Sequence, residues 1–275
     1  MLRTMFTATN TLSQTQQQID NISKNLTNTS TIGYKTKQAN FSELMYQQYN
    51  NDKFDKTVRD SPVGIRYGVG ARIGQIQSNQ AQGALQRTDR HLDFAMTEED
   101  RYFNVELPNG ETAYTRNGAF YLTPVEPGIT MLVNGDGYPV MDANGERITF
   151  PDFPTGFIML PNGTLDVNYE NSTESFDVAV TSILKPQVME HKPGGTYIQV
   201  PANLEELNYT EADLYTDLQG ANREDIGIQA GVLEMSNVEI PKEMSDLISA
   251  QRSYQFNTRA ISIADQMLGL INGIR

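Results

Sequence analysis

The chain has 275 residues, of which 38% are hydrophobic, with no cysteine and a net charge of −13. A chain of this length can bury one large core or two modest ones. Without cysteine it has no thiolate nucleophile, no cysteine-ligated metal and no disulfide. No segment approaches the roughly 18 apolar residues that cross a bilayer. Residues 1–18 also lack the continuous apolar core of a cleaved secretory signal.

The charge is unevenly distributed along the chain. Residues 98–230 carry 22 acidic and 6 basic side chains, a net of −16, whereas residues 1–97 carry a net of +4 and residues 231–275 a net of −1. Such an acidic middle segment argues against nucleic acid as its partner. We expect it to form a solvated acidic surface.

A long helix of about 26 residues is predicted within residues 1–32, which contain neither glycine nor proline. One side of this helix carries an apolar residue every seven positions, at Met5, Leu12, Ile19 and Leu26. The companion row of this heptad pattern starts at Leu2 and is otherwise polar. The Asn and Thr residues of 25–31 compete for backbone hydrogen bonds and weaken the helix. Gly33 then offers the positive-φ position that commonly stops a helix.

The middle of the chain has a different pattern. Residues 36–90 are predicted as an extended connecting region, in which Val69, Ala71, Ile73 and Ile76 partly alternate with other residues. Residues 91–202 are predicted as a β-rich domain of short antiparallel strands, because turn signals divide them, including five Asn-Gly pairs between residues 109 and 163. Residues 203–235 are predicted as a second connecting region, polar over 203–225 and with room for one short helix.

A second long helix, of about 32 residues, is predicted from Pro241, which suits the first turn of a helix. Glu243 and Asp246 lie near its positive end. Its heptad row consists of Leu247, Tyr254, Ile261 and Leu268. The companion row is mostly polar and consists of Met244, Gln251, Thr258, Asp265 and Asn272.

Both ends of the chain therefore share a half-apolar heptad pattern. We predict that residues 1–35 and 236–275 pack together as a coiled-coil-like helical domain, and that the fold class is α+β with the β-rich domain in the middle. Heptad side chains alone recover only part of the entropy lost in ordering two such helices, so we expect the pair to need further neighbours. The predicted assembly seam is Leu2, Met5, Leu12, Ile19, Leu26, Met244, Leu247, Tyr254, Ile261 and Leu268.

The chemistry-bearing residues form no convincing catalytic or metal motif. His91 and His191 lie 100 residues apart without a second ligand at a recognisable spacing. The run of Glu98, Glu99 and Asp100 is explained by a solvated loop, and the Asp-rich turns near residues 136–146 lack the ligand order of a calcium loop. We therefore predict no enzymatic activity, no metal site and no cofactor.

Three short motifs carry a resemblance to a known family. Asn25–Lys35, with the sequence NLTNTSTIGYK, is similar to the Asn-Leu-Ala-Asn-x-x-Thr-x-Gly-Phe/Tyr-Lys motif of the axial proteins of the bacterial flagellum, in the basal-body rod and hook family. Gly231–Val238 resembles the C-terminal motif of that family, which continues in Glu243–Met244, Leu247–Ile248 and Ala250–Asn257. Tyr114–Phe120 with Gly137–Val140 resemble the family's β domain. The motif residues are Asn25, Leu26, Asn28, Gly33, Tyr34, Lys35, Glu234, Ser236, Asn237, Gln251, Arg252, Tyr254 and Asn257.

The resemblance is closest to the distal rod protein or its proximal-rod relative, because hook proteins are usually considerably longer. Three features depart from the family pattern: Ile32 stands where many members have Pro, Tyr34 replaces the commoner Phe, and residues 123–130 interrupt what is usually a simple turn. These departures leave the paralogue open.

The resemblance implies a structural subunit of the flagellar rod, the hollow drive shaft that carries motor torque to the hook. Its partners would be other copies of itself, other rod and hook proteins, and the type III export apparatus, without a cleaved signal peptide. It would lie in the flagellar basal body outside the cytoplasm, with the terminal helices as an inner layer and the β domain as an outer layer. No nucleic acid, small-molecule substrate or membrane span is implied.

At the N-terminal motif, we expect Gly33 to let the chain turn out of the helical layer, Tyr34 to anchor it and Lys35 to remain solvated. We further expect the terminal helices to be largely disordered in the free chain and to order on assembly. Two alternatives remain. One is a proximal-rod or hook-like axial subunit, and the other is a secreted cell-wall-binding module or hydrolase whose helical ends are incidental.

Overall fold

The computed structural model describes residues 2–43, 47–49, 65–67, 71–151, 154–170, 172–192, 194–204 and 209–273. The chain divides into two compact units. Unit 1 consists of residues 1–26, 37–77 and 240–275, and unit 2 consists of residues 27–36 and 78–239. The chain therefore passes from one unit to the other four times, after residues 26, 36, 77 and 239.

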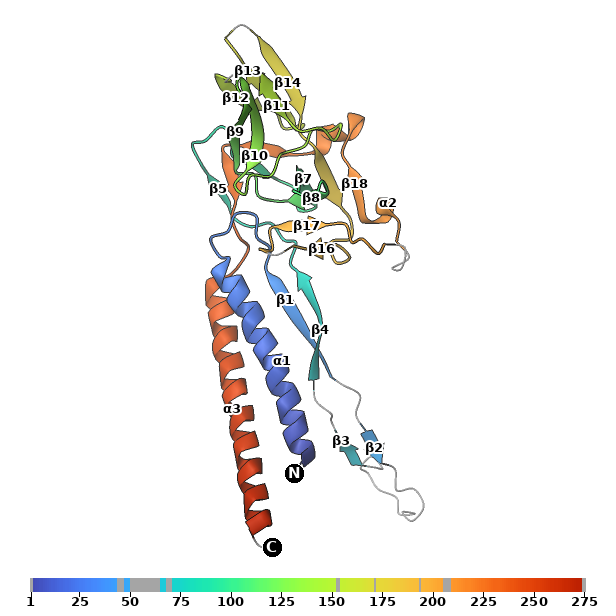
Figure 1. The fold of residues 1–275 in the computed structure, drawn as a ribbon, viewed down its shortest axis with the longest axis vertical. Helices are drawn as coiled ribbons and strands as arrows, with labels where there is room; N and C mark the ends of the chain where they lie inside the picture. The colour runs from blue at the N-terminus through green and yellow to red at the C-terminus, as the bar shows by residue number, and fades with distance from the viewer. Residues whose placement is uncertain are drawn as a thin grey trace. The chain divides into compact units, whose positions relative to one another are not determined.

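Unit 1 contains two long helices, α1 (Leu2–Thr27) and α3 (Ile240–Gly273), of 26 and 34 residues. They lie side by side and run in opposite directions, so that both chain termini lie at the same end of the pair (Figure 1). Pro241 lies in the first turn of α3, where its missing N–H has no intrahelical partner to lose. The predicted packing of the two ends and the α+β fold class are confirmed.

The least exposed row of α3 contains small side chains. Ala250 and Ala264 are buried and lie in the same heptad row as Glu243, which is also buried. On α1 the least exposed side chains include Thr15 and Ile22. Because alanine projects little from the backbone, this row lets a neighbouring helix approach closely.

Two short strand pairs complete the description of unit 1. Strand β1 (Lys37–Glu43) is paired with β4 (Ala71–Ser78), and β2 (Gln47–Tyr49) is paired with β3 (Ile65–Tyr67). The final residue of β4, Ser78, already belongs to unit 2. Of the residues predicted to alternate, Ala71, Ile73 and Ile76 lie in β4, and Val69 lies outside the described residues.

Unit 2 is built of short strands around one main apolar core. Its largest sheet has six strands in the order β16-β17-β8-β7-β15-β18, and two sheets of three strands have the orders β11-β10-β9 and β12-β13-β14. In the core, the ring of Phe120 contacts the rings of Phe94 and Phe103, and a second cluster surrounds Tyr102 and Leu214. The strands in these three sheets are β7 (Arg101–Glu106), β8 (Thr112–Thr115), β9 (Phe120–Glu126), β10 (Ile129–Asn134), β11 (Thr149–Pro151), β12 (Gly156–Met159), β13 (Thr164–Asn168), β14 (Thr173–Asp177), β15 (Val180–Ile183), β16 (Glu190–His191), β17 (Tyr197–Gln199) and β18 (Tyr215–Asp217).

Two further pairs of strands join the C-terminal part of unit 2 to its beginning. Strand β19 (Ile228–Ala230) pairs with β6 (Phe94–Met96), and β20 (Val232–Glu234) pairs with β5 (Leu85–Arg87). The polar connector before them contains a short helix, α2 (Glu211–Leu214), and the 3-10 helix η1 (Gly220–Asp225).

The Asn-Gly pairs do not all serve the same purpose. Gly110, Gly145 and Gly163 have positive φ values of 80°, 82° and 82°, as tight turns require. Gly118 does not; there, a Cβ atom would lie 1.8 Å from the carbonyl oxygen of Phe94, so the constraint is close backbone approach. The sequence identifies both as turn residues without distinguishing the two causes.

Candidate functional site

The N-terminal and C-terminal motifs meet in unit 2. The N–H of Gly33 donates to the carbonyl oxygen of Glu234 at 2.8 Å, and the N–H of Asn237 donates to the carbonyl oxygen of Tyr34 at 3.4 Å. Segments that lie about 200 residues apart in sequence are thus hydrogen-bonded to each other. We call Lys35, Arg116, Glu234 and their hydrogen-bond partners in unit 2 the junction cluster.

Gly33 is required at this position for two reasons. Its φ of +70° confirms the positive-φ conformation expected from the sequence. In addition, a Cβ atom would lie 2.6 Å from the backbone carbon of Arg116 and 2.7 Å from the backbone nitrogen of Asn117. The helix itself ends earlier, at Thr27, so Gly33 shapes the turn beyond α1 rather than capping it.

Glu234 is the centre of the junction cluster, and it is 1% exposed. Its Oε1 atom accepts hydrogen bonds from Lys35 Nζ at 2.7 Å and from the N–H of Gly83 at 3.0 Å. Its Oε2 atom accepts one from Arg116 Nε at 2.8 Å, and Arg116 Nη2 lies 2.7 Å from the same oxygen. One carboxylate therefore binds two buried cations and a backbone N–H.

The expectation that Lys35 remains solvated is wrong. Lys35 is buried, and besides the bond to Glu234 its Nζ atom donates to the carbonyl oxygens of Gln80 at 3.2 Å and Ala81 at 2.9 Å. All three ammonium donors thus have acceptors. Burial lowers the pKa of Lys35, and the positive charge of Arg116 lowers it further, while Glu234 acts in the opposite direction.

Arg116 attaches the cluster to the β-rich part of unit 2. Its Nη1 atom donates to the carbonyl oxygens of Glu98 at 2.5 Å and Arg101 at 2.6 Å, and its guanidinium carbon lies 5.5 Å from the ring centroid of Tyr102. These contacts orient the guanidinium plane toward Glu234. Because burying charges is costly, the arrangement is stable only while each charge keeps its partners.

Asn237 joins three segments through its side-chain amide. Its Oδ1 atom accepts hydrogen bonds from the N–H of Thr36 at 2.7 Å and from its hydroxyl at 2.6 Å. Its Nδ2 atom donates to the carbonyl oxygens of Asn79 at 2.9 Å and Ala81 at 2.8 Å. The N–H of Asn79 in turn donates to the carbonyl oxygen of Thr36 at 2.8 Å.

The junction cluster therefore involves every segment of unit 2 that continues into unit 1. Residues 27–36 carry Gly33 and Lys35, residues 78–83 carry the acceptor carbonyls, and residues 234–239 carry Glu234 and Asn237. Chain segments leading to both long helices and to β1 and β4 are thus hydrogen-bonded together within one network.

Asn25 has a comparable role inside unit 1. Its Nδ2 atom donates to the carbonyl oxygen of Lys37 at 2.9 Å, and its Oδ1 atom accepts from the N–H of Lys37 at 3.0 Å, which reproduces the hydrogen bonds of a neighbouring strand. Asn21 donates to the same carbonyl at 2.7 Å. Asn25 also donates to Glu243 on α3 at 3.2 Å, and burial raises the pKa of that carboxyl group.

The remaining motif residues lie apart from the junction cluster. Asn28 accepts a hydrogen bond from the Thr31 hydroxyl at 3.1 Å, and Ser236 accepts one from the N–H of Val238 at 3.4 Å. Asn257 donates to the carbonyl of Ser253 within α3 at 3.0 Å. Gln251, Arg252 and Tyr254 are exposed on α3.

The predicted seam residues lie on the two helices of unit 1. Met244 and Tyr254 are exposed in the single chain. The structure describes the backbone of Leu2 in α1 but not its side chain. Half-buried seam residues are Met5, Leu12, Ile19, Leu26, Leu247, Ile261 and Leu268.

Arg116, Gly83 and Glu243 were not among the site residues predicted from the sequence. Arg116 stands inside a stretch that resembles the family's β domain, but nothing in its neighbourhood indicates that it binds Glu234, 118 positions away. Gly83 was unremarkable in sequence; its Cβ atom would lie 1.9 Å from the carbonyl oxygen of Met235. Only the folded chain brings these residues together.

Neither histidine belongs to a cluster suited to catalysis. His91 is exposed, and the Nε2 atom of His191 lies 3.0 Å from the hydroxyl of Ser78. Across the described residues, no group of three or more His, Cys, Asp or Glu side chains is placed to hold a metal ion. Within the same part of the chain, no helix is long and apolar enough to cross a membrane.

Comparison with known proteins gives matches to both motif-bearing regions. The family model described as Flagellar basal body rod FlgEFG protein C-terminal matches residues 229–274, which include Glu234 and α3. The model described as Flagellar hook protein FlgE/F/G D1 domain matches residues 98–172, which include Arg116.

Similar curated proteins cover the whole chain. The flagellar hook-basal body complex protein FlhP of Bacillus subtilis is 44% identical over 100% of both chains. The flagellar basal-body rod protein FlgG of Borreliella burgdorferi is 31% identical over 100% of this chain and 99% of that protein. The FlgG protein of Bacillus subtilis is 28% identical over 98% of this chain and 97% of that protein.

With these matches, the paired terminal helices and the joined end motifs define a class: structural axial proteins of the bacterial flagellum. The chain belongs to the flagellar basal-body rod and hook protein family. The resemblance stated from the motifs is confirmed.

Proposed function

We propose that this protein is a subunit of the flagellar rod that assembles helically with copies of itself into a hollow shaft and transmits motor torque to the hook. The observation that carries the proposal is a contrast on α3. Glu243, Ala250 and Ala264 form a buried row, whereas large apolar side chains elsewhere on the helix, including Phe256 and Leu270, are exposed. An open helical assembly covers such faces by repeating one contact between successive copies.

In this proposal the two units divide the work. The helices of unit 1 pack around the axial channel as an inner layer, and the acidic β-rich unit forms the outer layer. The junction cluster carries load between the chain segments that lead to the helices and the β-rich unit. Its dense hydrogen bonding supports a mechanical rather than a catalytic role, and we accordingly propose no enzymatic activity.

The proposal includes export and location. The chain would be exported by the flagellar type III apparatus without a cleaved signal and would lie in the basal body outside the cytoplasm, in contact with other rod and hook proteins. The greater identity to FlhP than to FlgG of the same species, 44% against 28%, favours a position shared with FlhP-type hook-basal body proteins. A proximal-rod position remains the alternative within the family.

Electron microscopy of purified basal bodies tests this directly. An epitope inserted at Gly110, a turn position where added atoms meet nothing within 4 Å, labels the chain without disturbing its core. We expect label on the rod, and its distance from the hook decides between the distal and proximal positions. Label confined to the cell wall or the cytoplasm contradicts the proposal.

The acidic middle of the chain makes a second expectation testable. With a net charge of −16 over residues 98–230, unit 2 should be repelled by anionic cell-wall polymers. The full chain should therefore bind anionic wall polymer weakly at low salt. Tight binding that falls steeply as salt is raised contradicts this part of the proposal.

A further inference from the structure

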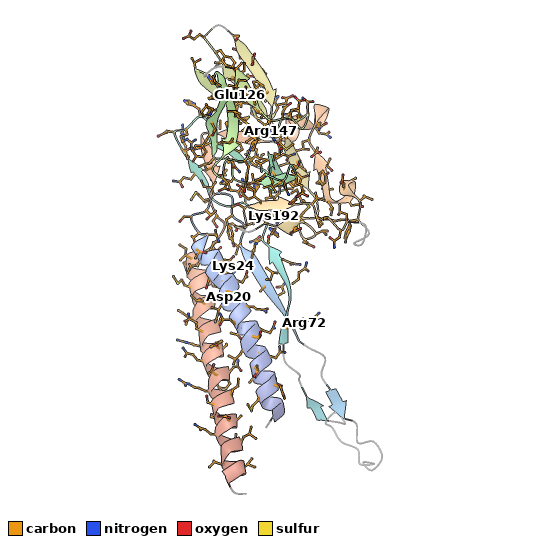
Figure 2. The ribbon with its side chains drawn as sticks, in the orientation of Figure 1. Asp20, Lys24, Arg72, Glu126, Arg147 and Lys192 are labelled. Carbon is orange, nitrogen blue, oxygen red and sulfur yellow. The ribbon has the colours of Figure 1, made fainter. Side chains whose placement is uncertain are left out.

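The β9–β10 hairpin ends in an exposed apolar and acidic tip. Val125 is 55% exposed, Ile129 is also exposed, and Glu126 stands between them in sequence. Glu126, labelled in Figure 2, is the last residue of β9 in the sheet formed by β9, β10 and β11.

Two prolines and a glycine restrict the backbone of the tip. Pro124 and Pro127 fix the backbone on both sides of Val125 and Glu126, and Gly128 closes the turn with a φ of +85°. The pairing of β9 with β10 shifts register here: Ile129 faces Glu126, but Thr130 faces Pro124. Val125 is thus the extra residue of a β-bulge, a device that redirects a side chain. A rigid tip loses little entropy on binding.

Elsewhere on unit 2 lies a groove of about 420 Å³. Its apolar side is formed by β12, where Ile158 is 53% exposed. Its polar side is formed by the segment that follows β5, with Arg87, Arg90 and His91 against a single acidic residue, Asp89. The volume lies within the usual range for binding pockets.

Arg87 is the cation in this groove that is available to a partner. Arg90 already has partners. Its Nη1 atom lies 3.1 Å from Asp93 Oδ1, and its Nη2 atom donates to the carbonyl oxygen of Phe120 at 2.7 Å. Its guanidinium carbon lies 4.4 Å from the ring centroid of Tyr121. The Arg87 side chain is exposed, and among the described residues it has no ion pair. In unit 2 as a whole, acidic side chains greatly outnumber basic ones. A groove with a basic side next to an apolar side therefore favours an apolar segment that carries a carboxylate.

We propose that the β9–β10 tip of one copy docks into this groove on the next copy. Val125 and Ile129 contact the Ile158 side of the groove, and Glu126 pairs with Arg87. Because tip and groove are different surfaces of one chain, the contact is heterologous and leaves a free tip and a free groove at the two ends of any chain of copies. The inference rests on the proposed self-assembly and adds an outer-layer contact to it.

The absence of cysteine makes a direct test possible. The variant carrying Val125→Cys and Ile158→Cys is allowed to assemble under reducing conditions, and assembly is followed by sedimentation. After mild oxidation and denaturation, a ladder of dimers, trimers and higher multimers is expected, because a disulfide requires the two Cβ atoms to come within about 4.5 Å. Each single-cysteine variant should give at most dimers.

A matched control uses Val125→Cys with Leu184→Cys, since Leu184 is equally exposed on unit 2 but lies outside the groove. We expect at least tenfold less cross-linked multimer from this pair than from the pair at Val125 and Ile158. Sedimenting assemblies without the ladder overturn the docking contact while leaving the proposed function intact. A chain that never sediments under any condition contradicts the proposed self-assembly and the docking contact together.

A charge exchange tests the ion pair separately. Arg87→Glu and Glu126→Arg should each reduce the sedimenting fraction about tenfold, and the double variant should restore most of it. Lys192→Glu makes the same change of charge outside the groove and should have little effect. Failure of the double variant to exceed either single variant overturns the pairing of Glu126 with Arg87.

Discussion

The charged side chains of the junction cluster have partners within one chain, whereas apolar side chains of the helix pair are exposed. In the junction cluster, Glu234, Lys35 and Arg116 are almost fully buried and bind one another within a single chain. On α3, Phe256 is 73% exposed and Leu270 is 70% exposed, so their apolar surface has no cover in a single chain. The comparison indicates that the junction cluster is complete on folding, and under the proposed function the helix pair is completed by association.

The physical cause is the kind of interaction each region uses. Buried charges and amide hydrogen bonds demand defined partners and exclude water, so a single chain must supply all of them. An apolar helix face has no directional demand and can be covered by any well-fitting copy. The following predictions test whether this division is real, in order of decreasing effect on stability.

The largest effect is expected from Glu234→Ala. It leaves Lys35 and Arg116 buried without their carboxylate, which typically costs about 3–5 kcal/mol. For a unit of this size the melting temperature of unit 2 should fall by about 6–20 °C, as measured by differential scanning calorimetry. The matched control is Glu106→Ala, which removes the partner of Arg147 in an ion pair whose arginine is 57% exposed. That change should cost at most about 1 kcal/mol, and equal losses in the two variants would show that the junction cluster has no special role.

A somewhat smaller effect is expected from Gly33→Ala. The substitution combines left-handed backbone strain of about 1–3 kcal/mol with a clash against the backbone of Arg116 and Asn117. Gly110→Ala is the control, because Gly110 has a similar φ of +80° but nothing within 4 Å of an added Cβ. Chemical denaturation should show a clearly greater loss at Gly33. Identical losses would mean that close packing at the junction is unimportant.

Asp100 gives a smaller, pH-dependent effect. Burial raises the pKa of this carboxyl group, but hydrogen bonds from Ser182 and Arg101 outweigh burial, so the folded pKa lies below its ordinary value of 3.8. A depressed folded pKa contributes stability above the unfolded pKa, and this contribution is lost as the pH falls through the folded pKa.

Asp100→Asn should therefore lower stability at pH 7 by less than about 1 kcal/mol, since the carboxylate is partly exposed. The difference from the unmodified chain should disappear well below pH 3.8, where both side chains are neutral. Thermal melts at several pH values measure this difference in stability. A difference that stays constant across the range would show that the charge of Asp100 is not its cause.

The smallest effect on stability is expected from Phe256→Ser combined with Leu270→Ser. Both side chains are exposed, so the melting temperature of the free chain should change by the equivalent of no more than about 0.5 kcal/mol. Assembly and motility, measured by sedimentation and by complementation of a deletion strain, should nevertheless be lost. Ser262→Ala, at an exposed polar position of the same helix, is the control. Normal motility in the double variant would contradict the role given to this face.

Sequence reasoning predicted the helices and the strands better than it predicted the junction. The absence of Gly and Pro over residues 1–32, Pro241 and the seven-residue spacing indicated two long helices, which α1 and α3 confirm. The pattern did not reveal which companion row is buried. The predicted seam includes Met244 of one companion row, whereas the buried row contains Glu243, Ala250 and Ala264. Small residues carry little hydrophobic signal although they permit close helix contact.

The motif residues illustrate a different limit. Lys35 next to Tyr34 gave no indication of burial, because a lysine is normally solvated and its partner Glu234 lies 199 positions away. Gly33 could be assigned a positive φ from its context, but its contact with Arg116 depends on tertiary structure. Local rules predicted the backbone conformation, and long-range pairing determined the function of the side chains.

Hydrogen exchange on the free and the assembled chain tests the central claim most directly. In the free chain, the amides of Gly33 and Met235, which donate to the carbonyls of Glu234 and Ala84, should exchange slowly. The amides in the middle of α3, around Phe256, should exchange orders of magnitude faster in the free chain and become protected only on assembly. Amides of α3 that are as slow in the free chain as those of the junction cluster, and unchanged on assembly, would contradict the account.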